Sequence, residues 1–150
     1  MTGRRVCLVV MAVALVALGW QTRRAADRLY AGRLLARVEA RTQAALAARR
    51  APSTMFAEHL AWLDEAGRRD PLEIGVPLAR GAQYLLLRRP ADAIAAYRVA
   101  EQLEPRPEVA LNLGRALWMQ GDRDGAAAAF RRAVTLNPLL RTEVPPGVLD

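Results

Sequence analysis

Two segments of this chain repeat each other 33 residues apart, and this internal repeat limits the possible folds more than any other feature. The stretch ADAIAAYRVAEQLEP begins at Ala91, and DGAAAAFRRAVTLNP begins at Asp124. Small, aromatic and proline positions coincide between the copies: Gly81 with Gly114, Ala93 with Ala126, Tyr97 with Phe130, Ala100 with Ala133, and Pro105 with Pro138. A fainter upstream copy places Ala66, Asp70 and Pro71 34 residues before Ala100, Glu104 and Pro105. Such a period is typical of solenoids, which need about three stacked units to bury their apolar faces.

The composition predicts an all-α fold and no nucleic-acid-binding face. Alanine, leucine and arginine dominate, all 22 basic residues are arginine, and no stretch alternates as a strand would. The net charge of +7 is uneven: residues 1–50 carry ten arginines against Asp27 and Glu39, which gives +8, and residues 51–150 give −1. A nucleic-acid-binding domain concentrates its basic residues on a folded face. The near-neutral repeats therefore argue against a nucleic-acid partner.

The N-terminal segment has the pattern of a single-pass membrane anchor over residues 1–22. No charged residue lies between Arg5 and Arg23, and Val6 to Trp20 is strongly apolar. A spanning helix needs about 17–25 residues, and a tryptophan is favoured at the headgroup level. The same layout also fits a cleaved signal peptide, with Ala17-Leu18-Gly19 at the cleavage site, or a buried core helix. We favour the anchor because a basic, helical segment follows, and we expect Cys7 to be a small apolar residue within it.

Two features of the sequence predict opposite orientations of the anchor. The arginines that follow it favour a cytoplasmic repeat domain by the positive-inside rule, whereas a short basic N-terminus before an apolar run favours export. We expect a bacterial inner-membrane protein with a periplasmic repeat domain. Residues 23–52 are expected to form a basic juxtamembrane helix. It either binds anionic lipid or, as we favour, is a stalk that begins the solenoid.

Helix boundaries in the repeat region are predicted from prolines, glycines and capping residues. Pro52 ends one helix, and Ser53 or Thr54 is expected to cap the next. The run Asp70-Pro71-Leu72-Glu73 has the pattern of a helix start, and with Pro77 it predicts a helix from about Val76 to Arg88. Further helices are expected to start at Pro90 and Pro107, with a hairpin turn at Gly121-Asp122 and a last helix from Gly125 to Leu136. The predicted repeat domain is 53–140, with a degenerate unit ending near 73, repeats 74–106 and 107–140, and a tail at 141–150.

These residues resemble the tetratricopeptide repeat family, whose hairpins carry small residues between the helices, an aromatic residue in the second helix and a closing proline. The later copy carries Leu113-Gly114, Gly121-Asp122, Ala126, Phe130, Ala133 and Asn137-Pro138. The earlier copy carries Gly81, Tyr84, Ala93, Tyr97, Ala100 and Pro105, but has Arg80 where leucine is usual and Arg88 where a turn glycine is usual. In the degenerate unit, from about Ala40 to Pro71, Ala47 replaces the packing glycine. With its apolar N-terminus, the chain is similar to small bacterial membrane-anchored members of the family.

The resemblance implies that the first helix of each hairpin lines a concave groove that binds a partner protein or peptide. The groove residues that it implies are Leu78, Ala82, Leu85 and Leu86, followed by Glu108, Leu111, Asn112, Arg115, Trp118 and Met119. Tryptophan and arginine are favoured at binding hot spots, although Trp118 and Met119 would also suit packing against a neighbouring helix. Asn112 and Arg115 would supply part of a clamp for a C-terminal carboxylate. Apolar Leu78, Ala82 and Leu111 stand where further clamp residues are expected, which argues against that ligand.

No catalytic, cofactor or metal site is predicted. His59 is the only histidine, no cysteine lies in the repeats, and Asp64 and Glu65 diverge as neighbours on a helix. No glycine-rich phosphate loop is present. The expected function is a non-catalytic, membrane-anchored scaffold or adaptor. Two alternatives stay open: a small assembly subunit whose repeats are permanently buried in a complex, and a soluble exported protein whose signal peptide is removed.

The C-terminal tail is too short for a capping helix. Only LLRTEVPPGVLD follows Pro138, so the last helix has an apolar flank with no further helix to cover it. Either Leu139, Leu140, Val144 and Val148 fold back over that flank, or a partner covers it. We expect the Leu139-Leu140 end to fold back and the rest of the flank to serve as an interaction surface.

Overall fold

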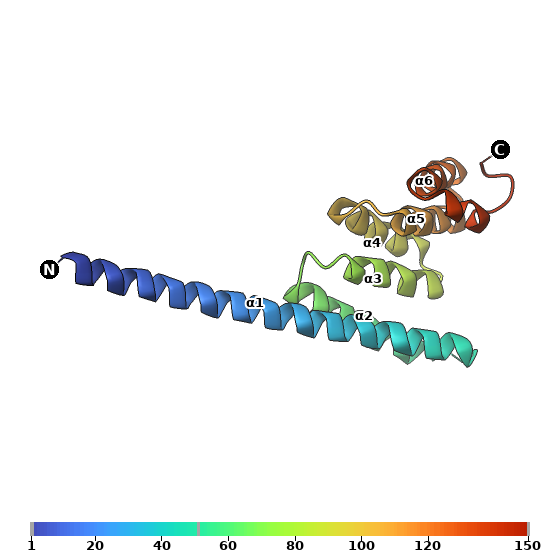
Figure 1. Ribbon diagram of the computed structural model, residues 1–150. Helices are drawn as coiled ribbons and strands as arrows, with labels where there is room; N and C mark the ends of the chain where they lie inside the picture. Colours follow the sequence, from blue (N-terminus) through green and yellow to red (C-terminus); the bar gives the residue numbers. More distant parts are fainter. Residues whose placement is uncertain (1, 51, 150) are drawn as a thin grey trace.

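The structure, a computed structural model, describes residues 2–50 and 52–149, and every regular element in that part of the chain is helical. The all-α prediction is confirmed. Six α-helices are followed by a short 3-10 helix (Figure 1). Their bounds are α1 Thr2–Ala47, α2 Ser53–Arg69, α3 Gly75–Leu86, α4 Pro90–Leu103, α5 Pro107–Gln120, α6 Arg123–Leu136 and η1 Pro138–Glu143.

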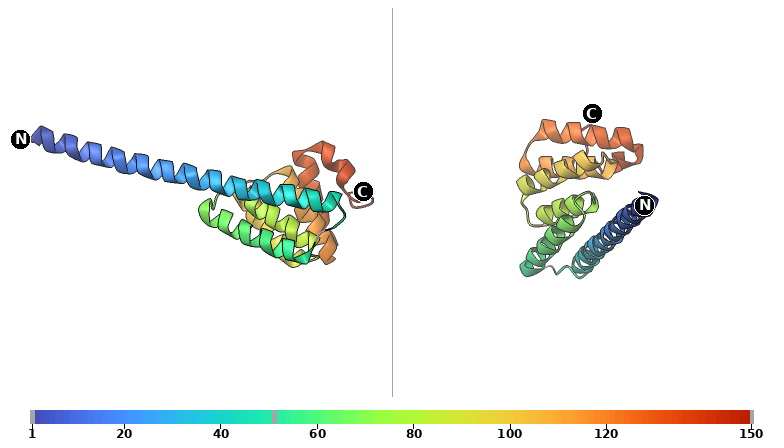
Figure 2. Two further views of the ribbon diagram at one scale, coloured as in Figure 1. Left: turned by 90° about the horizontal axis from the view of Figure 1, so that it is seen from below. Right: turned by 90° about the vertical axis from the view of Figure 1, so that its left-hand side faces the viewer.

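Helix α1 is one continuous helix with a projecting half and a packed half. Its N-terminal half projects away from the other helices, and its C-terminal half lies beside α2 (Figures 1 and 2). The two helices share a cluster in which Val38 of α1 and Leu63 of α2 are almost fully buried, and Asp27 pairs with Arg69 at 3.0 Å. The packing of the first hairpin therefore starts upstream of the predicted boundary at residue 53.

The projecting half of α1 exposes apolar side chains on all sides. Large apolar residues from Val9 to Trp20 are more than half exposed, and Val16 is 73% exposed. The side chains of residues 1–8, including Cys7 and the start of the predicted anchor, lie outside the described part. No helix in the part of the chain that the structure describes is both long and apolar enough to cross a membrane.

The same turn closes all three helical hairpins, which are α1–α2, α3–α4 and α5–α6. The turn residues Arg49, Arg88 and Gly121 have φ of 51°, 55° and 95°, in the left-handed region. In each case this residue and its successor donate backbone hydrogen bonds back into the helix, for example Arg89 N–H to Tyr84 O at 2.8 Å. This pattern is the Schellman motif. The first hairpin, which the sequence marks only weakly, therefore has the same turn geometry as the two clear repeats.

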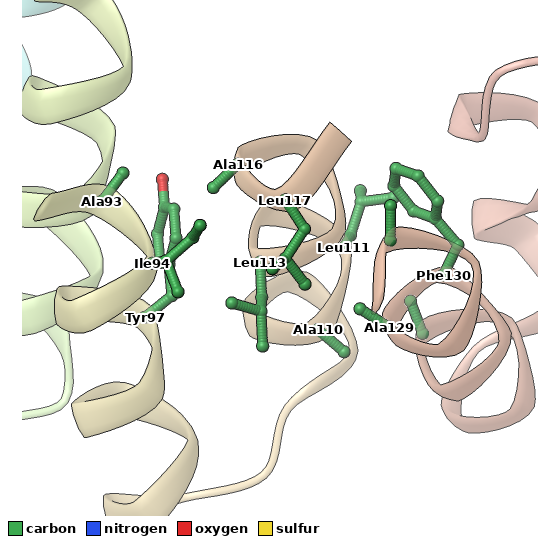
Figure 3. Close-up of a cluster of buried hydrophobic side chains, with 12 residues drawn as sticks. Ala93, Ile94, Tyr97, Ala110, Leu111, Leu113, Ala116, Leu117, Ala129 and Phe130 are labelled. Carbon is green, nitrogen blue, oxygen red and sulfur yellow. The ribbon is translucent and has the colours of Figure 1, made fainter. Parts of the chain in front are cut away.

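Glycine–aromatic contacts join the two helices of each clear repeat, at the glycine and aromatic positions that the repeat marks. A Cβ at Gly114 would meet the Phe130 ring at 2.6 Å, and a Cβ at Gly81 would collide with the Tyr97 ring. Both rings are at most 1% exposed, and the alanines at the repeat positions of α4 and α6 are fully buried. Figure 3 shows Tyr97 and Phe130 on either side of α5. Burial raises the pKa of the Tyr97 hydroxyl well above its ordinary value, so that group stays neutral.

Arg80 has a structural role that explains its departure from the family pattern. Its guanidinium Nη2 donates to Asp64 Oδ1 at 2.7 Å and to Leu63 O at 3.4 Å. Asp64 and Leu63 belong to α2, whereas Arg80 belongs to α3. Arg80 thus joins the first hairpin to the second by hydrogen bonds.

Several predicted helix boundaries were wrong. Neither Ser53 nor Thr54 caps α2, because the helix already begins at Ser53 and its N-cap is Pro52. Asp70 closes α2 by donating its N–H to Ala66 O, and α3 begins at Gly75, whose N–H bonds to Glu73 Oε1. Helix α3 ends at Leu86, before Arg88, because Arg88 adopts the turn conformation. Helix α6 starts two residues early, at Arg123, because Asp122 is its N-cap.

The tail folds back over the last hairpin, as expected, and three of the four residues named for this contact take part in it. Leu140, Val144, Val148 and Leu149 pack against the main core, whereas Leu139 is 82% exposed. The expectation for Leu139 was therefore wrong. The side chain of Asn137 caps η1 by accepting a hydrogen bond from the Leu139 N–H, which starts the fold-back. An ion pair of 2.7 Å between Glu143 and Arg115 of α5 holds the tail in place.

Candidate functional site

The first helices of the three hairpins, α1, α3 and α5, line a common cleft of about 250 Å³. Its walls combine apolar, amide, hydroxyl and carboxylate side chains: Val38, Glu39, Thr42 and Gln43 from α1, Gly75, Leu78, Ala79, Ala82 and Gln83 from α3, and Asn112 from α5. Sequential hairpins stack side by side, which brings their first helices to one face of the solenoid. We call this cleft the groove.

Three predicted groove residues line the groove. Leu78 and Ala82 stand one helical turn apart on α3, and Asn112 faces them from α5. The α1 wall was not predicted, because residues 38–43 lie in the expected stalk and at the start of the degenerate unit, where the resemblance implies no groove residue. Leu34, Leu35, Val38 and Leu46 form an apolar stripe at helical spacing, which indicates a packed face in this segment but no groove.

Other predicted groove residues lie elsewhere. Leu111 is only 3% exposed and sits in the core between α5 and α6, beside Phe130 (Figure 3), so its assignment to the groove was wrong. Leu85 is half-buried against the same core. Trp118 also packs against this core, and the Arg123 guanidinium lies 3.5 Å from its ring centre, which agrees with the packing alternative. Met119 is 46% exposed, and neither it nor Glu108 or Leu86 lines the groove.

Arg115 is engaged within the chain. Its guanidinium donates to Asn112 Oδ1 at 3.2 Å and to Glu143 Oε2 at 2.7 Å. The predicted clamp pair of Asn112 and Arg115 is therefore linked to the C-terminal tail.

A buried hydrogen-bonded triad forms part of the floor of the groove, and no sequence pattern indicated it. His59 of α2 and Gln83 of α3 are 0% and 2% exposed, and His59 Nδ1 lies 3.1 Å from Gln83 Oε1. Gln83 Nε2 donates to Thr42 Oγ1 at 3.0 Å, and that hydroxyl donates to Val38 O at 2.8 Å. With Nδ1 protonated, His59 donates to Gln83, and these bonds are mutually consistent. The triad ties α1, α2 and α3 together.

The surroundings of His59 indicate a role in packing. Its ring stacks on Trp62 at a centroid distance of 5.7 Å, and the guanidinium groups of Arg37 and Arg41 lie over the Trp62 ring at 5.3 and 5.1 Å. His59 Nε2 is buried and has no hydrogen-bond partner among the described residues. Within that part of the chain, no three histidine, cysteine or carboxylate side chains are grouped to hold a metal ion. The arrangement orders the groove floor.

Comparisons with known proteins agree with this geometry. Residues 107–140 match the family model of the tetratricopeptide repeat. The fold is similar to the crystal structure of a thermophilic TPR protein of Thermus thermophilus, with a TM-score of 0.68 and 26% sequence identity. That similarity covers 93% of this chain and 74% of the other. No curated protein sequence matches the chain significantly.

Proposed function

We propose that this chain, a member of the tetratricopeptide repeat family, is a non-catalytic scaffold that binds a partner protein or peptide in the groove. The observation that carries the proposal is the convergence of α1, α3 and α5 on one cleft. Clefts with mostly apolar walls and a few placed polar groups are typical of binding sites. The proposal needs no chemistry beyond recognition.

The groove suits a short segment with alternating apolar and polar groups. Leu78 and Ala82 supply apolar contact, while Asn112, Gln43 and Thr42 supply amide and hydroxyl groups at its edges and floor. Main-chain amides of a bound peptide would find hydrogen-bond partners there. Because the triad fixes Gln83 and Thr42, this side of the groove is ordered before a partner arrives, which lowers the entropy cost of binding.

We further propose that α1 anchors the scaffold in a membrane, with the repeats on the periplasmic side of a bacterial inner membrane. Apolar side chains from Val9 to Trp20 are exposed around the helix, and the apolar run of the sequence extends upstream to Val6. A partner helix would cover one side of α1, whereas a bilayer covers every side at once. Trp20, at the end of the run, suits the headgroup level.

Co-purification from solubilised membranes tests the groove. The full chain and two variants are captured, and the proteins retained are compared. Ala82→Arg places a large cation in the groove, whereas Ala95→Arg makes the same change at an exposed site on α4, which does not line it. We expect Ala82→Arg to lose a partner that the parent and Ala95→Arg both retain. Equal retention by all three would contradict binding in the groove.

A further inference from the structure

Two arginines follow the exposed apolar part of α1 directly. Arg23 and Arg24 lie within about one helical turn of Trp20, and the Arg24 guanidinium sits 4.9 Å from the Trp20 ring centre. Together with Trp20 and Asp27 they line a surface hollow of about 360 Å³. We call Arg23 and Arg24 the collar.

The carboxylate nearest the collar is already engaged elsewhere. Asp27 Oδ1 accepts a hydrogen bond from Arg69 Nη1 of α2 at 3.0 Å, so that Asp27 is directed toward the hairpin. Glu39, the other acidic residue of the first fifty, lines the groove more than ten residues away along α1. Asp27 borders the same hollow but is ion-paired with Arg69 of α2, so the two positive charges of the collar face one carboxylate that is shared with the hairpin.

The net charge of the molecule is also concentrated on α1 and its closing turn. Residues 1–50 carry ten arginines and two carboxylates, or +8, against −1 for the rest of the chain. A cationic patch next to an apolar, all-round exposed segment is complementary to an anionic bilayer surface. A nucleic acid would match the charge of the collar but not the apolar segment beside it.

We propose that the collar binds the headgroups of anionic phospholipids. This inference rests on the proposed membrane anchoring of α1 and adds the class of lipid. When the apolar residues up to Trp20 lie in the hydrocarbon, the collar lies at the depth of the lipid phosphates. The reason is that Arg23 and Arg24 follow Trp20 within about one helical turn, which is about 5.4 Å along the axis. The continuous helix then holds the first hairpin next to an anionic leaflet.

Competition between two vesicle populations tests the proposal. The full chain is diluted from detergent into a mixture of phosphatidylcholine vesicles and vesicles containing about 30% phosphatidylglycerol, an anionic content that gives a negative surface potential. The populations carry different dyes and are separated by flotation. We expect the chain to favour the anionic vesicles at least about fivefold, an effect that weakens in high salt.

Paired variants assign the preference to the collar. The double variant Arg23→Gln, Arg24→Gln is expected to lose most of the preference but still bind vesicles, whereas Arg23→Lys, Arg24→Lys keeps it because the charge remains. The control double variant Arg131→Gln, Arg132→Gln removes the same charge from α6, and we expect it to leave the preference for anionic vesicles unchanged. Circular dichroism checks that every variant remains helical.

The outcomes separate this inference from the proposed anchoring. Equal binding to both vesicle types, or an unchanged preference in the glutamine variant, overturns the collar and leaves the anchor standing. Failure to bind either vesicle type overturns the anchor itself. If a DNA duplex at matched phosphate concentration displaces the chain from anionic vesicles through the collar, the site is a general polyanion site and the lipid assignment is wrong.

Discussion

Replacing Gly114 by alanine tests the contact that joins α5 to α6. The new Cβ would lie 2.6 Å from Cδ1 and Cε1 of Phe130, well inside ordinary van der Waals distance, and Phe130 is fully buried. Overpacking of this kind costs about 1–3 kcal/mol, and the better helix propensity of alanine offsets about 1 kcal/mol. We expect a net loss of up to about 2 kcal/mol, and a loss of several kcal/mol for Gly114→Leu, which adds more volume.

Gly32→Ala is the matched control, since nothing lies within 4 Å of a Cβ built at that exposed position of α1. There the same substitution is expected to stabilise the chain by about 1 kcal/mol. The melting temperatures of the two variants are compared by thermal unfolding of the full chain in mild detergent, followed by circular dichroism. For a chain of this length, a change of about 1 kcal/mol in stability shifts the melting temperature by about 2–4 °C. The difference between the variants isolates the clash. If Gly114→Ala stabilises as much as Gly32→Ala, the glycine is not at a close helix contact.

Three further predictions concern the turn after α3, the triad and the tail. Arg88→Gly is expected to stabilise the chain by about 1 kcal/mol, because φ at this position is 55° and glycine adopts it without strain. The control Arg98→Gly, within α4, should destabilise the chain by a similar amount. If both variants change the free energy of unfolding in urea equally, the argument is refuted. Gln83→Leu should cost about 1–3 kcal/mol, because it removes the hydrogen bonds of Gln83 to His59 and Thr42 and leaves His59 Nδ1 only the longer contact to Thr42 Oγ1. An unchanged urea midpoint would count against the triad. Deleting residues 139–150 should lower the melting temperature because it removes Leu140 and the tail that packs with it; an unchanged melting temperature would show that the tail is not a cap.

The two clear hairpins were predictable because each depends on a size constraint that only a few residue types meet. Gly81 must face the Tyr97 ring and Gly114 the Phe130 ring, so the pairs recur at one spacing. The first hairpin has no such signal. Its turn residue is Arg49, and the spacing from Arg49 to Arg88 is 39 residues instead of the 33 from Arg88 to Gly121. An arginine does not indicate a left-handed turn, although it can adopt one at a cost.

The boundary between the first hairpin and the first clear repeat was wrongly predicted for a local reason. The run from Asp70 to Glu73 has the residue types of a helix start, but Asp70 is already committed to closing α2. Helix α3 starts at Gly75 instead, which leaves Pro77 in its first turn, where the missing N–H costs little. The same residues suit either role, and the packing of α2 decides between them.

The groove was only partly predictable for a related reason. Leu78, Ala82 and Asn112 follow from the family resemblance, whereas Leu111 is buried in the core cluster that includes Phe130 of α6. The triad has no periodic signal at all. Whether a lone histidine and a lone glutamine become buried partners depends on three helices meeting, which no local pattern encodes.

Site-specific photo-crosslinking in cells tests the central claim, which is partner binding in the groove, most directly. A photoreactive phenylalanine analogue replaces Ala82, which lines the groove, or Ala95, which is exposed on α4 outside it. The account predicts a discrete crosslinked protein from Ala82 and none from Ala95. A crosslink to the same protein from Ala95, with none from Ala82, would contradict it.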